Sequence, residues 1–268
     1  MAKKSAGKSL VAQASIYDFP KYYELAFGSD WAAEVRFLRD IFTQHASGKV
    51  KRVIEPACGT GRILYQLCKA GIRVDGFDLN EVSLDYCRTR TEKRGLVSKV
   101  WHADMTDFES PVRYDSAFIM INSFRHLMDE QSAVSHLRCM ARAVRPGGVY
   151  VLGLYLCPSR AQISQNEHWS ARRGNLVVNS DVRYLRSSPK NRTVTYSMHF
   201  DVFTPTMHRA FEHILTLRSY TLAQFRSFID SCPEWEIDAV YDFQYEIDKP
   251  IRVDEKTEDA VFVLKRKA

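Results

Sequence analysis

The chain has 268 residues, of which 45% are hydrophobic and 26% charged, and its net charge is +6. This composition is ordinary for a folded domain and argues against global disorder, and the length allows one α/β domain with an insertion. No apolar run approaches the roughly 20 residues that span a bilayer. The first nine residues hold three lysines without an apolar core, which predicts a disordered basic tail rather than a secretory signal. We therefore expect a cytoplasmic protein without a membrane segment.

Six cysteines are spread along the chain. No two of them form a C-x-x-C pair, and none is spaced with a histidine as in a zinc site. We interpret them as reduced, mostly buried thiols and predict no metal centre. They are Cys58, Cys68, Cys87, Cys139, Cys157 and Cys232.

The first half of the chain changes from one long helical pattern to an alternation of strands and helices. Residues 17–45 are predicted to be helical, because Trp31, Val35, Leu38 and Phe42 recur at spacings of three and four. Strands are then expected over 52–55, 72–77, 97–102, 114–121 and 149–156. Helices are expected between them, over 61–70, 81–94 and 131–144. Strands separated by helices predict a parallel sheet with helices on both faces.

The second half begins with segments rich in Val, Thr, Tyr and Phe. Strands over 168–178, 182–187, 193–202 and 209–218, with turn signals among them, predict an antiparallel sheet inserted into the parallel domain. A helix then begins at Thr221, with Gln224 placed for a capping box. Two closing strands follow over 235–243 and 260–265. The expected fold is a Rossmann-like α/β domain with seven mostly parallel strands and an inserted antiparallel β subdomain.

A glycine-containing loop follows the first predicted strand of the parallel sheet. It spans Glu55-Pro56-Ala57-Cys58-Gly59-Thr60-Gly61, and parallel sheets bind ligands at the carboxyl ends of their strands. The dinucleotide fingerprint needs a small residue three positions after Gly61, where this chain has Leu64. A phosphate-binding P-loop is excluded, because no Gly-Lys-Ser/Thr follows. Nicotinamide and flavin binding are therefore disfavoured.

This loop resembles the first motif of class I methyltransferases that use S-adenosylmethionine (SAM), an acidic residue followed by G-C-G-T-G or a close variant. Here Glu55 is the acidic residue, and Ala57 replaces the first glycine. The resemblance extends over about residues 50–156. It implies that Glu55 organises the loop or meets the amino group of the methionine moiety through water. The loop residues that it assigns to the cofactor are Glu55, Ala57, Cys58, Gly59 and Gly61.

Other positions match the same family in order along the chain. The family ends its second strand with an acid that accepts hydrogen bonds from both ribose hydroxyls, and Asp78 stands there. An acid and an apolar residue follow the third strand beside the adenine, and the fourth strand ends beside the methionine moiety. The resemblance thus implies SAM as cofactor and S-adenosylhomocysteine as product. The cofactor residues that it adds are Asp78, Leu79, Asp104, Met105, Ile121 and Asn122.

The segment after the fourth strand bears on the methyl acceptor. It lacks the N/D-P-P-Y/F/W motif of nucleobase amino methyltransferases, and this disfavours such a substrate. Its sequence Asn122-Ser123-Phe124-Arg125-His126-Leu127 resembles the S-S-x-x-H-L segment of small-molecule N-methyltransferases, such as the sugar N,N-dimethyltransferases of antibiotic pathways. Those proteins also have a β-rich insertion and an N-terminal Tyr-Asp-x-x-Tyr helix, matched here by the segment from Tyr17 to Tyr23.

The resemblance to the small-molecule enzymes gives three candidate catalytic residues. His126 is the candidate base or substrate anchor, because a histidine of near-neutral pKa accepts a proton at working pH. Tyr22 and Tyr23 are the other candidates. The competing interpretation of His126 is a helix cap or loop contact, and that of the tyrosines is core packing over the cofactor.

Three parts of the chain are expected. Residues 1–45 form a tail and cofactor-covering helices, 46–158 with 219–268 form the SAM-binding domain, and 159–218 form a substrate-covering β subdomain. Between Arg160 and Arg218 lie nine Lys or Arg against four Asp or Glu. This charge is consistent with attraction of an anionic substrate, and equally with a solvated outer sheet face.

The leading hypothesis is a SAM-dependent methyltransferase that acts on an N or O atom of a small molecule, as a monomer or homodimer. An RNA or protein methyltransferase is the first alternative, although the basic residues are scattered over both faces of the strands and nucleic acid is therefore disfavoured. A non-catalytic SAM-binding module is the second, because fold does not fix function.

Overall fold

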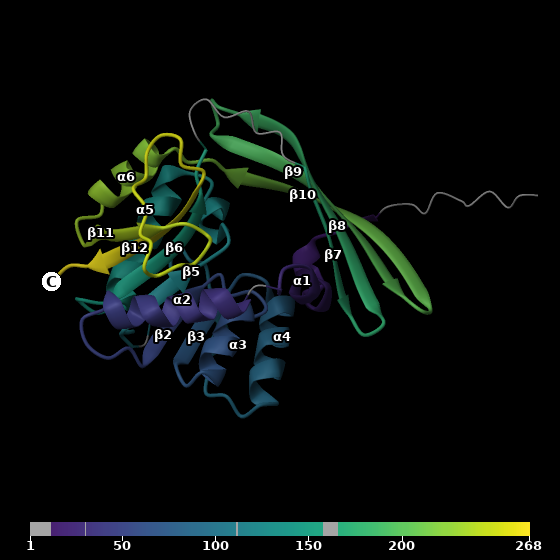
Figure 1. The fold of residues 1–268 in the computed structure, drawn as a ribbon, viewed down its shortest axis with the longest axis horizontal. Helices are drawn as coiled ribbons and strands as arrows, with labels where there is room; N and C mark the ends of the chain where they lie inside the picture. The colour runs from purple at the N-terminus through teal and green to yellow at the C-terminus, as the bar shows by residue number, and fades with distance from the viewer. Residues whose placement is uncertain (1–11, 30, 111, 158–165) are drawn as a thin grey trace, which may run out of the picture.

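A seven-stranded sheet forms the body of the molecule (Figure 1). The computed structural model describes residues 12–29, 31–110, 112–157 and 166–268, so the predicted basic tail lies outside it. The strand order is β11-β12-β6-β5-β2-β3-β4, and β12 alone among these strands runs against the others. The strands are β2 (Arg52–Pro56), β3 (Arg73–Asp78), β4 (Val100–His102), β5 (Ser116–Ile119), β6 (Val149–Tyr155), β11 (Trp235–Tyr241) and β12 (Asp259–Arg266).

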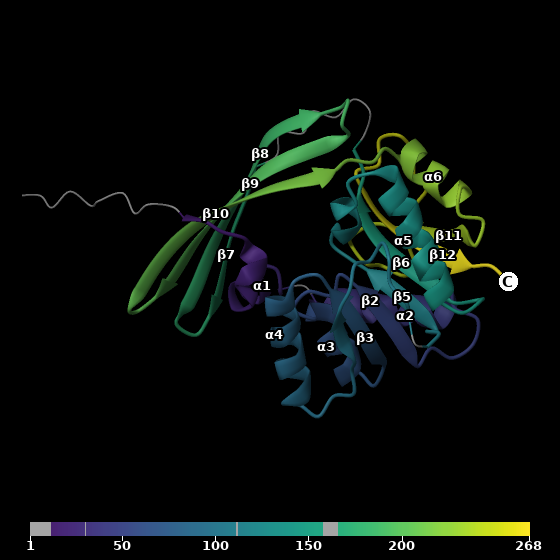
Figure 2. The ribbon, with the colours of Figure 1, turned by 180° about the vertical axis from the view of Figure 1, so that it is seen from behind.

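Helices cover both faces of this sheet, as the alternating sequence pattern predicts. One layer contains α2, α3 and α4, and the other contains α5 and α6 (Figures 1 and 2). Because both faces are covered, the central strands are buried along most of their length, and all four residues of β5 are buried. The helices are α2 (Trp31–Gln44), α3 (Arg62–Lys69), α4 (Glu81–Glu92), α5 (Glu130–Ala143) and α6 (Leu222–Asp230), with a short 3-10 turn η2 (Ser123–His126) after β5.

A second sheet of five strands extends away from the body (Figure 2). Its order is β1-β10-β9-β8-β7, antiparallel except for the β1–β10 pair. The helix α1 (Pro20–Ala26) and the 3-10 turn η1 (Ile16–Asp18) pack against it around Phe200 and Phe211. The strands are β1 (Ala12–Gln13), β7 (Glu167–Arg173), β8 (Leu176–Ser188), β9 (Thr193–Thr204) and β10 (Met207–Arg218). The expected inserted β subdomain is confirmed.

The predicted helix over residues 17–45 is wrong in one respect, because the chain breaks into η1, α1 and α2. Pro20 begins α1, and the helix ends before Gly28. A Cβ atom at Gly28 would lie 2.1 Å from the carbonyl oxygen of Glu24, so only glycine permits this close turn. Trp31 was predicted on the apolar face of the helix, but it is 37% exposed.

The strand boundaries in the insertion also differ from the prediction. The strand expected over 168–178 is two strands, because Gly174 turns the chain with φ of +59°. The gap expected at 179–181 does not exist, since Asn179, Ser180 and Asp181 pair with β9 in the middle of β8. Short polar residues on a long, half-exposed strand imitate a turn in sequence, although cross-strand pairing keeps them extended.

Several local expectations hold. The capping box at Thr221 and Gln224 is formed at the start of α6. All six cysteines are free, and four of them are buried. No helix in the described ranges is long and apolar enough to cross a membrane. The division into three parts remains a prediction. The first part contributes to both sheets, because β1 and α1 pack on the five-stranded sheet and α2 on the seven-stranded sheet.

Candidate cofactor site and acceptor side

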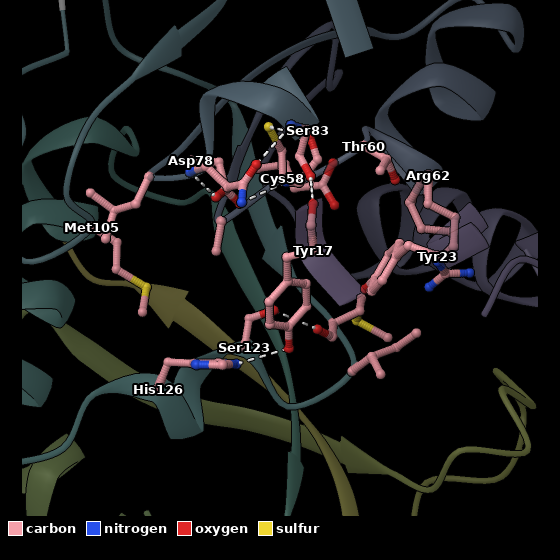
Figure 3. Close-up of a pocket in the computed structure, with 18 of the residues that line it drawn as sticks. Tyr17, Tyr23, Cys58, Thr60, Arg62, Asp78, Ser83, Met105, Ser123 and His126 are labelled. Atoms are coloured by element: carbon pink, nitrogen blue, oxygen red, sulfur yellow. Dashed lines mark hydrogen bonds between the residues drawn. The ribbon is translucent and has the colours of Figure 1, made fainter. Parts of the chain in front are cut away.

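A cavity of about 410 Å³ opens at the carboxyl ends of β2, β3 and β5, where the sequence places the cofactor loop. Of the predicted site residues, only Tyr22, Gly61, Asp104 and Asn122 lie outside its walls. Figure 3 shows Asp78 and Cys58 above the ring of Tyr17, with Met105 and His126 to the left of that ring and Tyr23 to its right. The fold therefore brings residues from both halves of the predicted site to one cavity.

The loop after β2 takes its shape from three residues with left-handed backbone. Ala57 and Gly59 each have φ of +50°, and Gly61 has φ of +70°. A Cβ atom at Gly61 would lie 2.3 Å from Sγ of Cys87, so this glycine lets α3 begin against α4 instead of lining the cavity. Ala57 adopts a conformation that costs a residue with a Cβ about 1 kcal/mol. Alanine can therefore replace the family's glycine at position 57, at the cost of backbone strain.

Leu64, whose size argued against dinucleotide binding, is fully buried beneath the loop. It packs onto Gly76 of β3, where an added Cβ atom would lie 2.8 Å from its Cδ1. The small residue that permits close packing of helix on strand is thus on β3 rather than on α3. Leu64 therefore does not prevent close packing of α3 on β3, contrary to the premise of the sequence argument.

Asp78 ends β3 and holds the loop in place. Its Oδ2 accepts a hydrogen bond from the backbone N–H of Gly59 at 2.8 Å, and its Oδ1 accepts one from the N–H of Asn80 at 2.8 Å. Each carboxylate oxygen can accept a further bond. Asn80 in turn caps α4 by accepting from the N–H of Ser83 at 2.8 Å. Asp78 therefore presents two oriented acceptors to the cavity, which suits a vicinal diol.

Glu55 has a buried carboxyl oxygen that lacks a hydrogen-bond partner among the described residues. Its side chain is buried at the end of β2, and Oε2 has no hydrogen-bond partner among the described residues. Burial raises the pKa of this carboxyl group well above its ordinary value, and the nearby Cys87 adds to that shift. An unpaired buried carboxyl group is costly unless a ligand satisfies it. The ammonium group of a methionine moiety has the matching charge and donors, so the residues present fit SAM.

The end of the cavity beyond β4 is apolar. Ala103 and Met105 line it, together with the exposed Leu79. Asp104 does not, because its Oδ1 accepts from both the N–H and the hydroxyl of Thr106, each at 2.8 Å. Asp104 therefore closes a turn, and the apolar surface suited to an adenine ring comes from its neighbours.

The side facing β10 holds two aromatic hydroxyls and a histidine. The Oη atom of Tyr17 lies 3.5 Å from Nε2 of His126, and the Tyr17 ring packs 5.7 Å from that of Tyr23 (Figure 3). Burial lowers the pKa of His126 and raises that of Tyr17. It also raises the pKa of Tyr23 to about 12. All three side chains are accordingly uncharged at neutral pH, and His126 can accept a proton.

Two predicted residues are placed elsewhere. Tyr22 stacks on Phe19 with ring centroids 5.6 Å apart, in the apolar cluster beneath the five-stranded sheet. Asn122 has φ of +65°, and its Oδ1 accepts from the backbone N–H of Tyr155 at 2.8 Å. Asn122 thus ties the end of β5 to the end of β6. Tyr17, which opens the Tyr-Asp motif of the sequence, lines the cavity together with Tyr23, whereas Tyr22 does not.

Buried ion pairs behind the loop were not foreseen. Arg62 lines the cavity and pairs with Glu34 of α2 at 2.5 Å. Glu24 of α1 accepts from the hydroxyl of Thr60 at 2.5 Å and pairs with Arg90 at 2.8 Å. These contacts fasten α1 and α2 to the loop. Their partners are far apart in sequence, so no local pattern could reveal them.

The fold and the cavity together define a protein that binds SAM at the switch point of a Rossmann-like sheet. Residues 53–148 match the family model described as "Methyltransferase domain". By these matches the chain contains a methyltransferase domain and is similar to class I SAM-dependent methyltransferases, the sugar N-methyltransferases among them.

Three comparisons give the extent of this similarity. A Streptomyces venezuelae protein named dTDP-3-amino-3,4,6-trideoxy-alpha-D-glucopyranose N,N-dimethyltransferase is 25% identical over 210 residues, which are 77% of this chain and 84% of that protein. The crystal structure of Streptomyces venezuelae DesVI superimposes with a TM-score of 0.77 at 18% identity and covers 96% of this chain and 100% of its own. A putative methyltransferase of Geobacillus sp. (strain WCH70) is 27% identical over 109 residues, and this chain spans 44% of its length.

Proposed function

We propose that this protein transfers a methyl group from SAM to an N or O atom of a small molecule held beside Tyr17 and His126. The observation that carries the proposal is the joint placement of three groups around one cavity. They are the buried Glu55 carboxyl group with its unpaired Oε2 atom, the two acceptors of Asp78 and the uncharged Tyr17–His126 pair. Relatives that methylate sugar amines support a small-molecule acceptor.

We assign the cofactor contacts as follows. Asp78 accepts from the ribose hydroxyls, because both of its oxygens are already oriented by backbone N–H groups. Glu55 accepts from the amino group of the methionine moiety. Met105, with Ala103 and Leu79, covers the adenine. Tyr22, Asp104 and Asn122 act through packing and turn geometry instead.

The chain contributes alignment and a proton acceptor. SAM, when bound, supplies an electrophilic methyl group on a positively charged sulfur. The acceptor must offer a lone pair to that group, and positioning is the main catalytic requirement. The imidazole of His126 is neutral at neutral pH, because burial lowers its pKa, and its unprotonated ring nitrogen can take the proton that an amine or hydroxyl acceptor loses. The hydroxyl of Tyr17 orients this imidazole from 3.5 Å.

The two alternatives from sequence receive no support here. Among the described residues, no Lys or Arg of the insertion lines either cavity of the structure, so its positive charge does not form an anion site or a nucleic-acid groove there. A non-catalytic module would need no uncharged Tyr17–His126 pair beside the cofactor space. The cytoplasmic location and the monomeric or dimeric state remain predictions.

Calorimetry with S-adenosylhomocysteine, followed by transfer of labelled methyl from SAM to a panel of amines, acids and phenols, tests the proposal. We expect micromolar binding and label transfer to at least one panel member. His126→Ala should lower that transfer about a hundredfold, whereas His168→Ala on the exposed face of β7 should not. Absence of S-adenosylhomocysteine binding would refute the proposed function.

A further inference from the structure

A second cavity, of about 210 Å³, lies next to the cofactor cavity and shares Arg62 and Ile121 with it. Its other walls come from segments of the chain that are far apart in sequence. We call it the aromatic pocket, because four rings and one buried carboxylate complete it, namely Phe27, Tyr155, Phe243, Tyr245 and Glu34. A ligand in the aromatic pocket would therefore be next to a molecule bound in the cofactor cavity.

The partition between the two cavities is fixed by backbone geometry. Ile121 has φ of +50°, which is strained for a β-branched residue, and strain of this kind concentrates at functional sites. Asn122 holds this conformation through its bond to the N–H of Tyr155. A Cβ atom at Gly153 would lie 3.1 Å from the ring of Phe243 and 3.5 Å from the nitrogen of Ile121. The absence of a side chain at Gly153 thus allows the ring to sit against the partition.

The polar groups of the aromatic pocket are already paired with each other. Glu34 accepts from Arg62 at 2.5 Å and from the Tyr245 hydroxyl at 3.1 Å. The ion pair contributes no net charge, and its guanidinium is engaged by a carboxylate. An anionic ligand would have to compete with Glu34 for that guanidinium. The rings of Tyr155 and Phe243, 5.1 Å apart and edge to face, supply the larger part of the ligand surface.

The charges beside these rings are predominantly negative. Asp259 pairs with Tyr155 across β12 and β6, and Asp242 directly precedes Phe243. Partial burial raises the pKa of Asp259, and the neighbouring carboxylates Glu258, Asp242 and Glu167 raise it further. Arg125 is the cation that acts on Tyr155 in this region. Two carboxylates, Asp259 and Glu167, act on Tyr155 against one guanidinium, which favours a positively charged ligand, and aromatic faces bind cations.

We propose that the aromatic pocket binds a positively charged amine group of the methyl acceptor. The inference rests on the proposed function and adds a substrate class to it, a small molecule that carries a cationic amine in addition to the atom that is methylated. The two groups differ, because a protonated or quaternary amine has no lone pair to attack a methyl group. The charge of the acceptor is therefore opposite in sign to that suggested by the basic insertion.

Binding of choline, compared with its uncharged carbon isostere neohexanol, tests this inference. Both probes are titrated by NMR into the full chain saturated with S-adenosylhomocysteine. Choline should bind about tenfold more tightly than neohexanol, the range expected for a cation over aromatic rings. Phe243→Leu should weaken choline binding about fivefold and leave S-adenosylhomocysteine affinity within about twofold. The matched control is Phe203→Leu, whose partly exposed ring stacks on His208 of the five-stranded sheet and does not line the pocket, and it should change neither.

The outcomes separate the two proposals. Equal binding of choline and neohexanol, or binding of neither to the saturated protein, would overturn the cationic-amine inference while the methyltransferase function stands. A choline affinity that Phe243→Leu leaves unchanged would overturn the assignment to the aromatic pocket. If Phe243→Leu weakened S-adenosylhomocysteine as strongly as choline, the aromatic pocket would belong to the cofactor site and the inference would fail. Loss of S-adenosylhomocysteine binding by the unmodified chain would instead refute the proposed function itself.

Discussion

The two sheets of this molecule are built differently. The seven-stranded sheet is covered by helices on both faces, and six of the seven residues of β6 are buried. The five-stranded sheet alternates buried and partly exposed residues along β9, and α1 with η1 forms the cluster on its covered face. The seven-stranded sheet, covered on both faces, can hold a cofactor loop rigidly. The position of η1 depends instead on its contacts with the one covered face of the five-stranded sheet. In the proposed function, cofactor binding therefore depends on the seven-stranded sheet, whereas placement of the acceptor depends also on the five-stranded sheet.

The Tyr17–His126 pair is where these two regions meet. Tyr17 belongs to η1 and packs edge to face on His213 of β10, with ring centroids 5.5 Å apart. His126 belongs to η2, directly after β5 of the seven-stranded sheet. Tyr17 and His126 are therefore in contact only when both sheets keep their positions relative to each other. Changes confined to one region should separate stability, cofactor affinity and turnover.

The largest expected effect comes from the buried ion pair that joins α2 to the cofactor loop. Arg62→Met leaves Glu34 buried without its guanidinium and should lower the free energy of unfolding by about 3–5 kcal/mol. Urea denaturation measures the loss. The control is Arg88→Met, which removes the partly exposed contacts to Glu81 and Asp85 and should cost less than about 1 kcal/mol. Equal losses for both variants would contradict the importance given to the buried pair.

A loss of cofactor affinity without a comparable loss of the fold should follow Asp78→Ala. Two charge-assisted hydrogen bonds to the ribose disappear, so the Kd for S-adenosylhomocysteine should rise about a hundredfold. Asp104→Ala, at a strand end of similar appearance, should change that Kd by less than about twofold, because its Oδ1 serves Thr106. Calorimetry on both variants decides. A large effect of Asp104→Ala would restore the direct cofactor contact expected from sequence.

The smallest effect is expected from pH. In the proposed mechanism the neutral imidazole of His126 is the proton acceptor, so activity should fall as pH drops through the pKa that this residue has in the folded protein. Burial lowers that pKa, so the acid limb of kcat/KM should lie below the ordinary histidine value of about 6.5. Between pH 8 and pH 7 the rate should therefore change by less than about twofold. His126→Gln should abolish the limb, and a limb that persists in this variant would assign it to another group.

Some site residues were predictable because their positions are set locally. Glu55 and Asp78 end two neighbouring parallel strands, and the apolar runs before them locate those strands in the sequence. Asp104 has the same sequence signature as Asp78, yet it closes a turn at Thr106. Which strand-end acid faces the cavity depends on the turn that follows it, and the residue pattern does not specify that turn.

The contact between Tyr17 and His126, and the aromatic pocket, required the three-dimensional arrangement. Tyr17, Tyr22 and Tyr23 are indistinguishable as residue types, but the break at Gly28 and the packing of α1 turn Tyr22 toward Phe19 and away from the cavity. Tyr17 and His126 are 109 positions apart. The periodicity of apolar residues in the sequence does not predict a contact between residues so far apart.

The sequence by itself determined the parallel sheet, its helices on both faces, the inserted antiparallel strands and the loop that binds SAM. These features follow from apolar periodicity and glycine conformation, which act over a few residues. Only the tertiary structure decided which side chains form the aromatic pocket, because Phe27, Ile121, Tyr155 and Phe243 come together only when distant strand ends and helices pack. Long-range packing, rather than local preference, therefore sets what this methyltransferase can accept.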